Sequence, residues 1–171
     1  MFRRLREQGP AVAVPAAWAV VAGAVVGIVS TRTLLIAHVV MAVLQAGFLA
    51  ASWTDMSEGA LCTWRRIIGV GLLVTVAGAV GLAASLSALR AAAPIGWALL
   101  PAAGLVDVAQ RGGGPTYLGA GVVSGLGGLV LAAGAVVGTA VVVAGVVLAG
   151  VGQTIGILRA AADTRASGGT V

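Results

Sequence analysis

The chain has few charged residues, only 9% of its 171 positions, and it contains no lysine. A soluble domain carries roughly 25% charged residues, because polar groups must cover its surface. This chain is instead 60% hydrophobic, with a mean hydropathy of +1.10. The shortage of charge excludes an ordinary soluble domain and predicts a protein whose apolar surface is covered by lipid.

Regular alternation of polar and apolar residues, the pattern of strands in a membrane barrel, is also missing. The apolar runs are continuous and about as long as a membrane-spanning helix. Since only helices and closed barrels satisfy every backbone hydrogen bond in hydrocarbon, we predict an all-α, polytopic integral membrane bundle. The single cysteine, Cys62, excludes an intrachain disulfide.

The chain lacks the residue combinations that mark common activities. It has no Ser-His-Asp set, zinc-protease motif, paired catalytic carboxylates or phosphate-binding lysine, so we expect neither an enzyme nor a bound cofactor. The net charge of +5 comes from ten arginines, which lie singly or in small groups at the ends of apolar runs. No basic face is interleaved with aromatic residues, so we expect the lipid bilayer, and not nucleic acid, as the partner.

Six segments are apolar enough to span a membrane, which takes a helix of about 20 residues. Residues 117–158 form an uncharged run that would be about 63 Å long as one helix, about twice the hydrocarbon thickness. This run is therefore divided by a turn at residues 134–138. The predicted helices, in a single transmembrane domain over residues 1–171, are 11–30, 33–53, 67–89, 92–108, 117–133 and 137–158. A polar loop at 54–66 and tails at 1–10 and 159–171 complete the chain.

The arginines indicate how the helices cross the membrane, because positive charge collects on the cytoplasmic side. With six helices and a cytoplasmic N-terminus, only Arg32 and Arg90 lie outside. The arginines on the inner side are then Arg3, Arg4, Arg6, Arg65, Arg66, Arg111, Arg159 and Arg165. Five helices would move the last two of these outside and weaken the asymmetry. We therefore predict a multi-pass protein of the cell membrane, with both termini and the polar loop in the cytoplasm.

His38, Met41 and Gln45 share one face of the second predicted helix, at i, i+3 and i+7. Polar residues inside a membrane are candidates for function, and Gln153 in the last helix is another, so these four form a candidate polar pathway. His38 is also a candidate ligand of haem or copper, or a histidine that relays protons. The alternative is a neutral histidine that bonds a neighbouring helix. Because a metal site recruits three or four ligands, we expect no metal site.

Charged residues near the helix ends form a second group of candidates. Asp107 and Arg111 have the spacing of an ion pair at the inner end of the fourth helix. In the polar loop, Asp55, Glu58 and Cys62 mix hard oxygen ligands with soft sulfur, which suits no metal well. We therefore interpret the loop as a solvated segment at the membrane interface.

Glycine is abundant, with 27 residues, and several pairs have the Gly-x-x-x-Gly spacing that lets helix backbones approach closely in lipid. The pairs are Gly23 and Gly27, Gly121 and Gly125, Gly134 and Gly138, and Gly152 and Gly156. They predict tight helix packing, either inside the chain or at a face that binds a second copy or another subunit of a membrane complex.

The two halves of the chain share a motif of uncommon residues. Pro-x-x-Trp-Ala occurs at residues 15–19 and again at 94–98, which is 79 residues later. Arg32 and Arg111 match at the same offset. These matches predict a repeat of three helices, and a second copy with an odd number of helices must be inverted in the membrane.

A further match suggests a change of register within this repeat. Val-Ala-Gly occurs at residues 76–78 and at 143–145, with an offset of 67. This offset predicts that the second half has lost a segment about as long as the polar loop. Inverted repeats are typical of transporters, whose sites lie near the middle of the membrane between the two copies.

The predicted repeat, the two prolines of the fourth helix and the polar face of the second favour a transport-type or channel-type scaffold for a small solute or ion. The near absence of charge within the helices favours instead a non-catalytic accessory or structural subunit of a larger membrane complex. A haem or quinone protein that uses His38 is a weaker alternative.

Overall fold

The computed structural model describes residues 2–168, with side chains described for residues 12–59 and 61–166. Within these residues the chain forms α-helices and one π-helical turn, and no strand. The elements are α1 Phe2–Val25, α2 Thr31–Ser52, α3 Gly59–Ala83, α4 Ser87–Val108, η1 Ala109–Gly113, α5 Pro115–Val137 and α6 Thr139–Gly168. The prediction of an all-α bundle of six helices is confirmed.

Five helices, α2 to α6, are long and apolar enough to cross a membrane, and α1 carries a shorter apolar segment, Val12–Val25. The side chains of Arg3, Arg4 and Arg6, which the sequence places on the inner side, lie outside the described residues. Valine and leucine side chains such as Val43 and Leu73 cover the outside of the bundle and are mostly exposed. Lipid chains can contact this apolar surface, as expected of a helical membrane protein.

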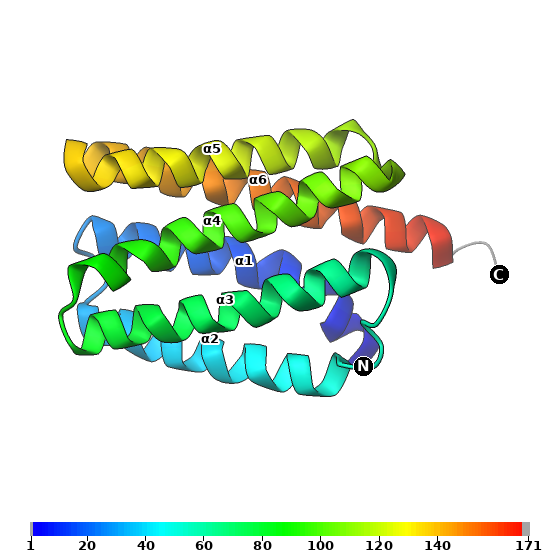
Figure 1. The fold of residues 1–171 in the computed structure, drawn as a ribbon, viewed down its shortest axis with the longest axis horizontal. Coiled ribbons are helices and arrows are strands. Elements are labelled where there is room, and N and C mark those ends of the chain that lie inside the picture. The colour runs from blue at the N-terminus through cyan, green and yellow to red at the C-terminus, as the bar shows by residue number, and fades with distance from the viewer. Residues whose placement is uncertain (1, 169–171) are drawn as a thin grey trace.

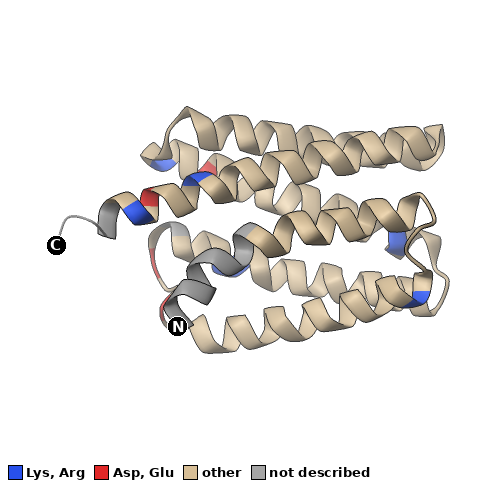
Figure 2. Ribbon diagram, turned by 180° about the vertical axis from the view of Figure 1, so that it is seen from behind, with Lys and Arg blue, Asp and Glu red and all other residues tan. Residues whose placement is uncertain are grey.

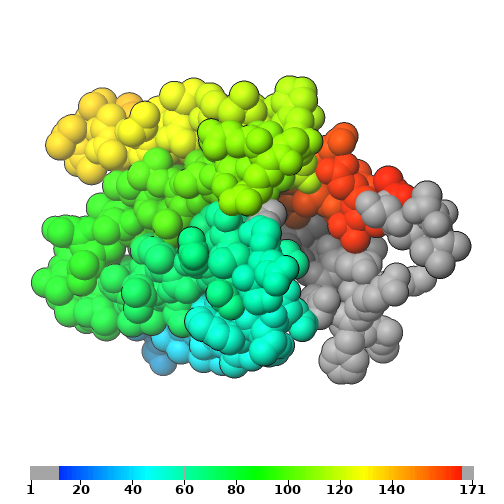
Figure 3. Space-filling model, turned by 45° about the vertical axis from the view of Figure 1, so that its right-hand side comes forward, coloured from blue at the N-terminus to red at the C-terminus, as the bar shows by residue number. Residues whose placement is uncertain are grey.

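Successive helices run in opposite directions, so the start of α1 and the end of α6 lie at the same end of the bundle (Figure 1). Helix α4 packs between α3 and α5, and α6 packs against α5 and α1. In the space-filling view α4 and α5 lie side by side along the molecule (Figure 3). Helix α2 packs against α3 but makes few contacts with α1.

The polar loop is shorter than predicted, because α3 begins at Gly59 and only residues 53–58 connect it to α2. Glu58 is the extended residue before the helix, and its carbonyl oxygen accepts from Cys62 N–H (3.2 Å) to close the first turn. Arg65 and Arg66 belong to α3. Long arginine side chains near a helix end can reach the membrane interface without interrupting the helix. A prediction that began the helix after the arginines therefore placed the start of α3 too late.

Gly23 and Gly27 end α1, and within the described chain they do not pack as a pair against another helix. Gly27 has a left-handed φ of +81° and lies beyond the last helical residue. Its N–H donates to Ala24 O (3.2 Å), while Ile28 N–H donates to Gly23 O (2.8 Å). These two bonds make a Schellman motif, which stops a helix. Among the residues that the structure describes, Gly27 packs against no other helix and instead supplies backbone freedom, which spacing alone does not distinguish from close packing.

A single residue, Gly138, connects α5 to α6, and it is the last residue of the predicted turn. Its φ of +134° and ψ of 177° belong to a region that essentially only glycine adopts. Its N–H donates to Gly134 O (3.0 Å). The chain therefore reverses between two apolar helices without a polar turn residue.

Helices α5 and α6 pack along a seam of mostly small residues, spaced alternately by three and four positions. The α5 members of this seam, all buried, are Ala120, Ser124, Gly127, Leu131 and Gly134. A Cβ atom on Gly152 of α6 would lie 2.5 Å from Ser124 N, and one on Gly145 would lie 2.7 Å from Leu131 N. The two backbones therefore touch directly, which in lipid is a main source of helix association.

Candidate functional site

A chain of hydrogen bonds between neutral side chains crosses the interior of the bundle, with the buried Gln153 of α6 near its middle. Trp18 Nε1 of α1 donates to Gln153 Oε1 (3.0 Å). Gln153 Nε2 donates to Ser124 Oγ of α5 (3.2 Å) and to Trp97 O of α4 (2.7 Å). Ser124 Oγ donates onward to Ala98 O (2.8 Å). One amide side chain thus joins four helices.

Pro101 explains why the carbonyl of Trp97 needs this partner. In an α-helix the carbonyl of residue 97 accepts from the N–H of residue 101, and proline has no N–H. The Trp97 carbonyl is therefore left without a helical donor inside a bundle that lipid surrounds. Gln153 Nε2 supplies the missing donor from α6. Neighbouring helices commonly satisfy the backbone groups that proline frees in a membrane.

The network continues through Trp97, whose Nε1 donates to Thr75 Oγ1 of α3 (2.9 Å). The Thr75 hydroxyl lies 3.2 Å from Gln45 Oε1 of α2 and 2.9 Å from Gly71 O of its own helix. Each of the six helices contributes to the network. Within the described part of the chain, every buried side-chain nitrogen or oxygen has a hydrogen-bond partner.

Charged side chains lie at the two ends of the bundle, away from the network (Figure 2). Arg32 and Arg90 occupy the first turns of α2 and α4, at one end. The opposite end holds the other charged side chains that the structure describes: Asp55, Glu58, Arg65, Arg66, Asp107, Arg111, Arg159, Asp163 and Arg165. The network is therefore uncharged along its whole described length.

The structure places Asp107 and Arg111 in an ion pair, with Arg111 Nε 2.8 Å from Asp107 Oδ2. Thr63 Oγ1 of α3 donates to the same carboxylate oxygen (2.9 Å), which ties α3 to α4. At the same end of the bundle, Tyr117 OH of α5 donates to Asp163 Oδ2 of α6 (2.9 Å). Each of these aspartates therefore holds two helices together near the membrane surface.

The polar loop is ordered by Arg65. Its Nη1 donates to Trp53 O (3.0 Å), and its guanidinium carbon lies 4.6 Å from the centre of a Trp53 ring. Its Nη2 lies 3.8 Å from Cys62 Sγ. The described residues contain no group of three or more histidine, cysteine or carboxylate side chains placed to hold a metal ion.

The structure places only two of the four residues of the candidate polar pathway in the network. Gln45 and Gln153 belong to the network, whereas His38 and Met41 are half-buried beside it. His38 Nδ1 lies 2.9 Å from a carbonyl oxygen of its own helix. The other edge of the ring lies against α3, since a Cβ on Gly78 would be 2.9 Å from His38 Nε2. This packing leaves little space at Nε2 for a haem iron.

The two remaining packing pairs of the sequence analysis lie against helices of the same chain. A Cβ on Gly121 would lie 3.0 Å from Ala102 O of α4, and one on Gly125 would lie 3.7 Å from Ala102 Cβ. Gly152 contacts α5, and a Cβ on Gly156 would lie 2.5 Å from a Leu105 methyl carbon of α4. These four glycines therefore permit close approach inside the bundle.

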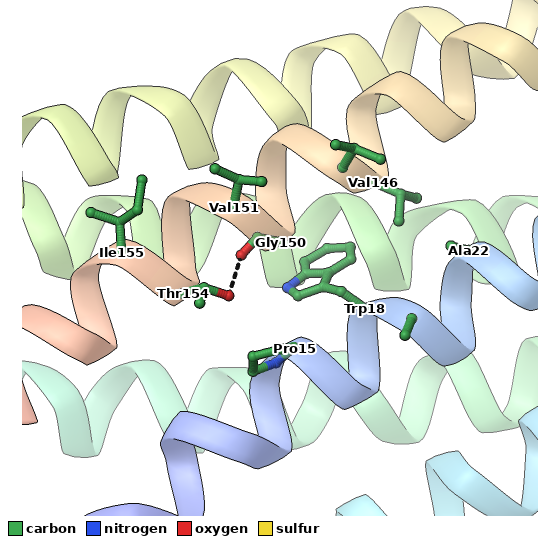
Figure 4. Close-up of a pocket in the computed structure, with 10 residues that line it drawn as sticks. Pro15, Trp18, Ala22, Val146, Gly150, Val151, Thr154 and Ile155 are labelled. Atoms are coloured by element: carbon green, nitrogen blue, oxygen red, sulfur yellow. Dashed lines mark hydrogen bonds between the residues drawn. The ribbon is translucent and has the colours of Figure 1, made fainter.

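A shallow groove of about 360 Å³ lies between α1 and α6 (Figure 4). Its floor is the Trp18 ring, which rests on Gly150, and Pro15 and Ala19 form the α1 side. The hydroxyl of Thr154 lies in the groove and donates to Gly150 O (2.7 Å). The remaining lining is almost wholly apolar.

Most of the polar core follows the offset of 79 residues, although Gln153 matches the apolar Val74. The matched pairs are Trp18 and Trp97, Gln45 and Ser124, Gly71 and Gly150, and Thr75 and Thr154. Each tryptophan lies against the glycine of the other half, Trp97 against Gly71 and Trp18 against Gly150. In each half the threonine hydroxyl donates to the carbonyl of the glycine in its own helix, at 2.9 Å in α3 and 2.7 Å in α6.

Burial supports the same offset in α2 and α5, which precede the predicted change of register. The buried residues of α2 are Gln45, Leu49 and Ser52, and each match in α5, at 124, 128 and 131, is also buried. In α3 and α6 the matched glycine and threonine contacts follow the offset of 79 residues and not the predicted offset of 67. Residues 132–137 match the loop at 53–58, but they continue α5 as helix.

Sequence reasoning did not identify Thr75 and Ser124, and it used Trp18 and Trp97 only as markers of the repeat. Each of these residues carries a polar group within an uncharged apolar run. That isolation is the sequence feature that could have marked them as candidates. Their partners lie on other helices, at separations from 22 to 135 residues, so no local pattern connects them.

The fold and the network define a helical membrane bundle whose helices are connected by hydrogen bonds between uncharged groups. Comparisons with protein-family models, with curated proteins and with solved structures found no match to this chain.

Proposed function

We propose that this protein is a transport-type membrane protein built from two inverted units, α1–α3 and α4–α6. The observation that carries the proposal is that tryptophan, glycine and threonine residues matched at one offset of 79 residues make matched contacts. The antiparallel course of successive helices supports inversion (Figure 1). Helix α4 also carries a proline at the interface between the units, as do the interrupted helices of many transporters.

The solute that suits this interior is small and uncharged. The side chains of the network are indole, amide and hydroxyl groups, and the described charged side chains lie at the ends of the bundle (Figure 2). An ion that crosses a membrane protein normally meets charged side chains or rings of carbonyl groups that replace its water. Neutral donors and acceptors would instead exchange hydrogen bonds with an alcohol or amide.

Liposomes that contain the purified protein test this proposal. Glycerol and urea serve as uncharged probes in a swelling assay, and potassium and chloride serve as charged probes. We expect faster swelling in an uncharged probe than in protein-free liposomes, without ion flux. Folded protein that leaves every swelling rate unchanged would contradict transport, and ion flux would contradict selection against charge.

A second candidate is a non-catalytic structural subunit of a membrane complex. It is favoured by the saturated network, whose hydrogen bonds are already made within the chain, and by the apolar groove on the outside of α1 and α6. This reading expects inactive liposomes and a defined larger species when native membranes are solubilised gently. A protein that migrates at the size of one chain under those conditions contradicts it.

A further inference from the structure

The two three-helix units are related by matched contacts, but they are not packed equally. Helix α5 lies against α4 through Gly121 and Gly125, whereas α1 and α2 make few contacts. Ala46, the match of Gly125, is exposed, and Ala42, the match of the buried Gly121, is half-buried. The first unit therefore has an open face where the second unit has a closed helix pair.

The hydrogen bonds of the two tryptophans differ in the same way. Trp97 Nε1 donates to Thr75, whose match in the second unit is Thr154. Trp18 Nε1 donates instead to Gln153, the residue directly before Thr154. In Figure 4 the Trp18 ring lies beside Gly150 and Thr154, with its nitrogen on the Thr154 side. Two acceptors for one indole N–H thus lie next to each other on α6.

We propose that the first unit has a second, closed conformation, in which α1 packs along α2 and Trp18 Nε1 donates to Thr154 Oγ1. This arrangement repeats the contacts that α4, α5, Trp97 and Thr75 already make. The indole exchanges one acceptor for another: Gln153 keeps its bonds to Trp97 O and Ser124, and its Oε1 gives up the Trp18 donor. The inference rests on the repeat that underlies the proposed function.

Closure changes the neighbours of Ala19. In the open conformation Ala19 lines the groove beside α6. Its match, Ala98, packs against α5, where a Cβ on Gly128 would lie 3.3 Å from Ala98 Cβ. The match of Gly128 is Leu49 of α2, so the closed conformation brings Ala19 and Leu49 within the distance that a disulfide spans.

Cysteine crosslinking in native membranes tests this inference, with Cys62→Ala as the background. The test pair is Ala19→Cys with Leu49→Cys. The control pair is Ala102→Cys with Gly125→Cys, since a Cβ on Gly125 lies 3.7 Å from Ala102 Cβ in this conformation. We expect both pairs to crosslink, the test pair more slowly. A control pair that crosslinks while the test pair stays free overturns the closed conformation.

A threonine variant tests the hydrogen-bond exchange separately. Thr154→Val keeps the shape of the side chain and removes the acceptor, so it should slow crosslinking of the test pair by roughly threefold, the effect of one average interhelical hydrogen bond. Thr164→Val, whose hydroxyl bonds only its own helix on the surface, serves as control. An unchanged rate with Thr154→Val overturns the exchange. Crosslinking without solute flux would refute transport while leaving the closed conformation in place.

Discussion

Gln153 uses both amide N–H groups and its carbonyl oxygen to bond three other helices. Replacing it with leucine removes all three bonds and leaves the Trp97 carbonyl without a donor. At about 0.6 kcal/mol for each interhelical bond, Gln153→Leu should lower the free energy of unfolding by roughly 2 kcal/mol. Reversible unfolding in bicelles measures the loss. Thr164→Val is the control and should change little, so equal losses for both variants would contradict this role.

Pro101 and Gln153 should be energetically coupled. Pro101→Ala restores the N–H that the Trp97 carbonyl lacks, so this carbonyl no longer depends on α6. Gln153→Leu should then cost less in the Pro101→Ala background than in the native chain. A double-mutant cycle in the same unfolding assay measures the coupling, and strictly additive losses would show that the two residues act independently.

The sequence predicted Pro101 inside the fourth helix and Gln153 as a candidate polar residue, but it placed Gln153 near a helix end. Helix α6 continues to Gly168, because the Arg159–Asp163 pair at i, i+4 and the Tyr117 hydroxyl hold its polar turns in the helix. The bond between Gln153 and Trp97 could not be predicted, since it depends on how α6 rotates against α4.

At the scale of helices, the turn between α5 and α6 depends on one backbone conformation. Gly138→Ala places a side chain at φ +134°, which costs on the order of 1–3 kcal/mol. The expected result is a lower unfolding free energy and a less stable α5–α6 pair. Gly47→Ala is the matched control, because a Cβ at Gly47 meets no atom within 4 Å and its backbone is helical. A Gly138→Ala protein as stable as the control would contradict this account of the turn.

The seam between α5 and α6 is equally sensitive to added volume. A methyl group on Gly152 would lie 2.5 Å from Ser124 N and 2.7 Å from Ala120 O, so the helices must move apart. Gly152→Ala should destabilise the protein by about 1–3 kcal/mol, as overpacking does in other cores. Gly119→Ala on the same helix pair has open space and should be neutral. Thermal unfolding of the two variants, measured in parallel, tests the difference.

Helix identity was predictable from hydropathy, and helix ends were not. The uncharged run from Tyr117 to Leu158 had to be two helices because of its length, and the turn fell within the predicted segment. The start of α3 was missed because Arg65 and Arg66 resemble loop residues in sequence. The alternating three-and-four spacing on α5 was present in the sequence, but only the structure shows that this face meets α6.

For the molecule as a whole, the unequal distribution of arginine predicts orientation. The end of the bundle with α3's first turn and α6's last turns should face the cytoplasm. Cys62, the only thiol, should therefore resist a membrane-impermeant maleimide in intact cells and react after lysis. Ser87→Cys in a Cys62→Ala background lies at the other end and should react in intact cells. The opposite pattern would invert the topology.

The proposed repeat was visible in the sequence only through its rare residues. Proline, tryptophan and arginine matched at one offset, whereas the Val-Ala-Gly match reflects a composition dominated by small apolar residues. The threonines at 75 and 154 carried the correct register, but threonine is common enough that the match gained meaning only from the glycine contacts beside it.

The hydrogen bond from Gln153 to the carbonyl that Pro101 leaves without a donor also matters during synthesis and membrane insertion of the chain. A ribosome finishes α4 before α6 exists, so the Trp97 carbonyl has no donor until Gln153, 56 residues later, has been made. Insertion of α6 supplies the missing donor. Chains truncated after α5 should therefore be degraded faster than full-length chains in a pulse-chase experiment. Adding Pro101→Ala to the truncated chain should slow its loss, because the carbonyl then has a donor in its own helix.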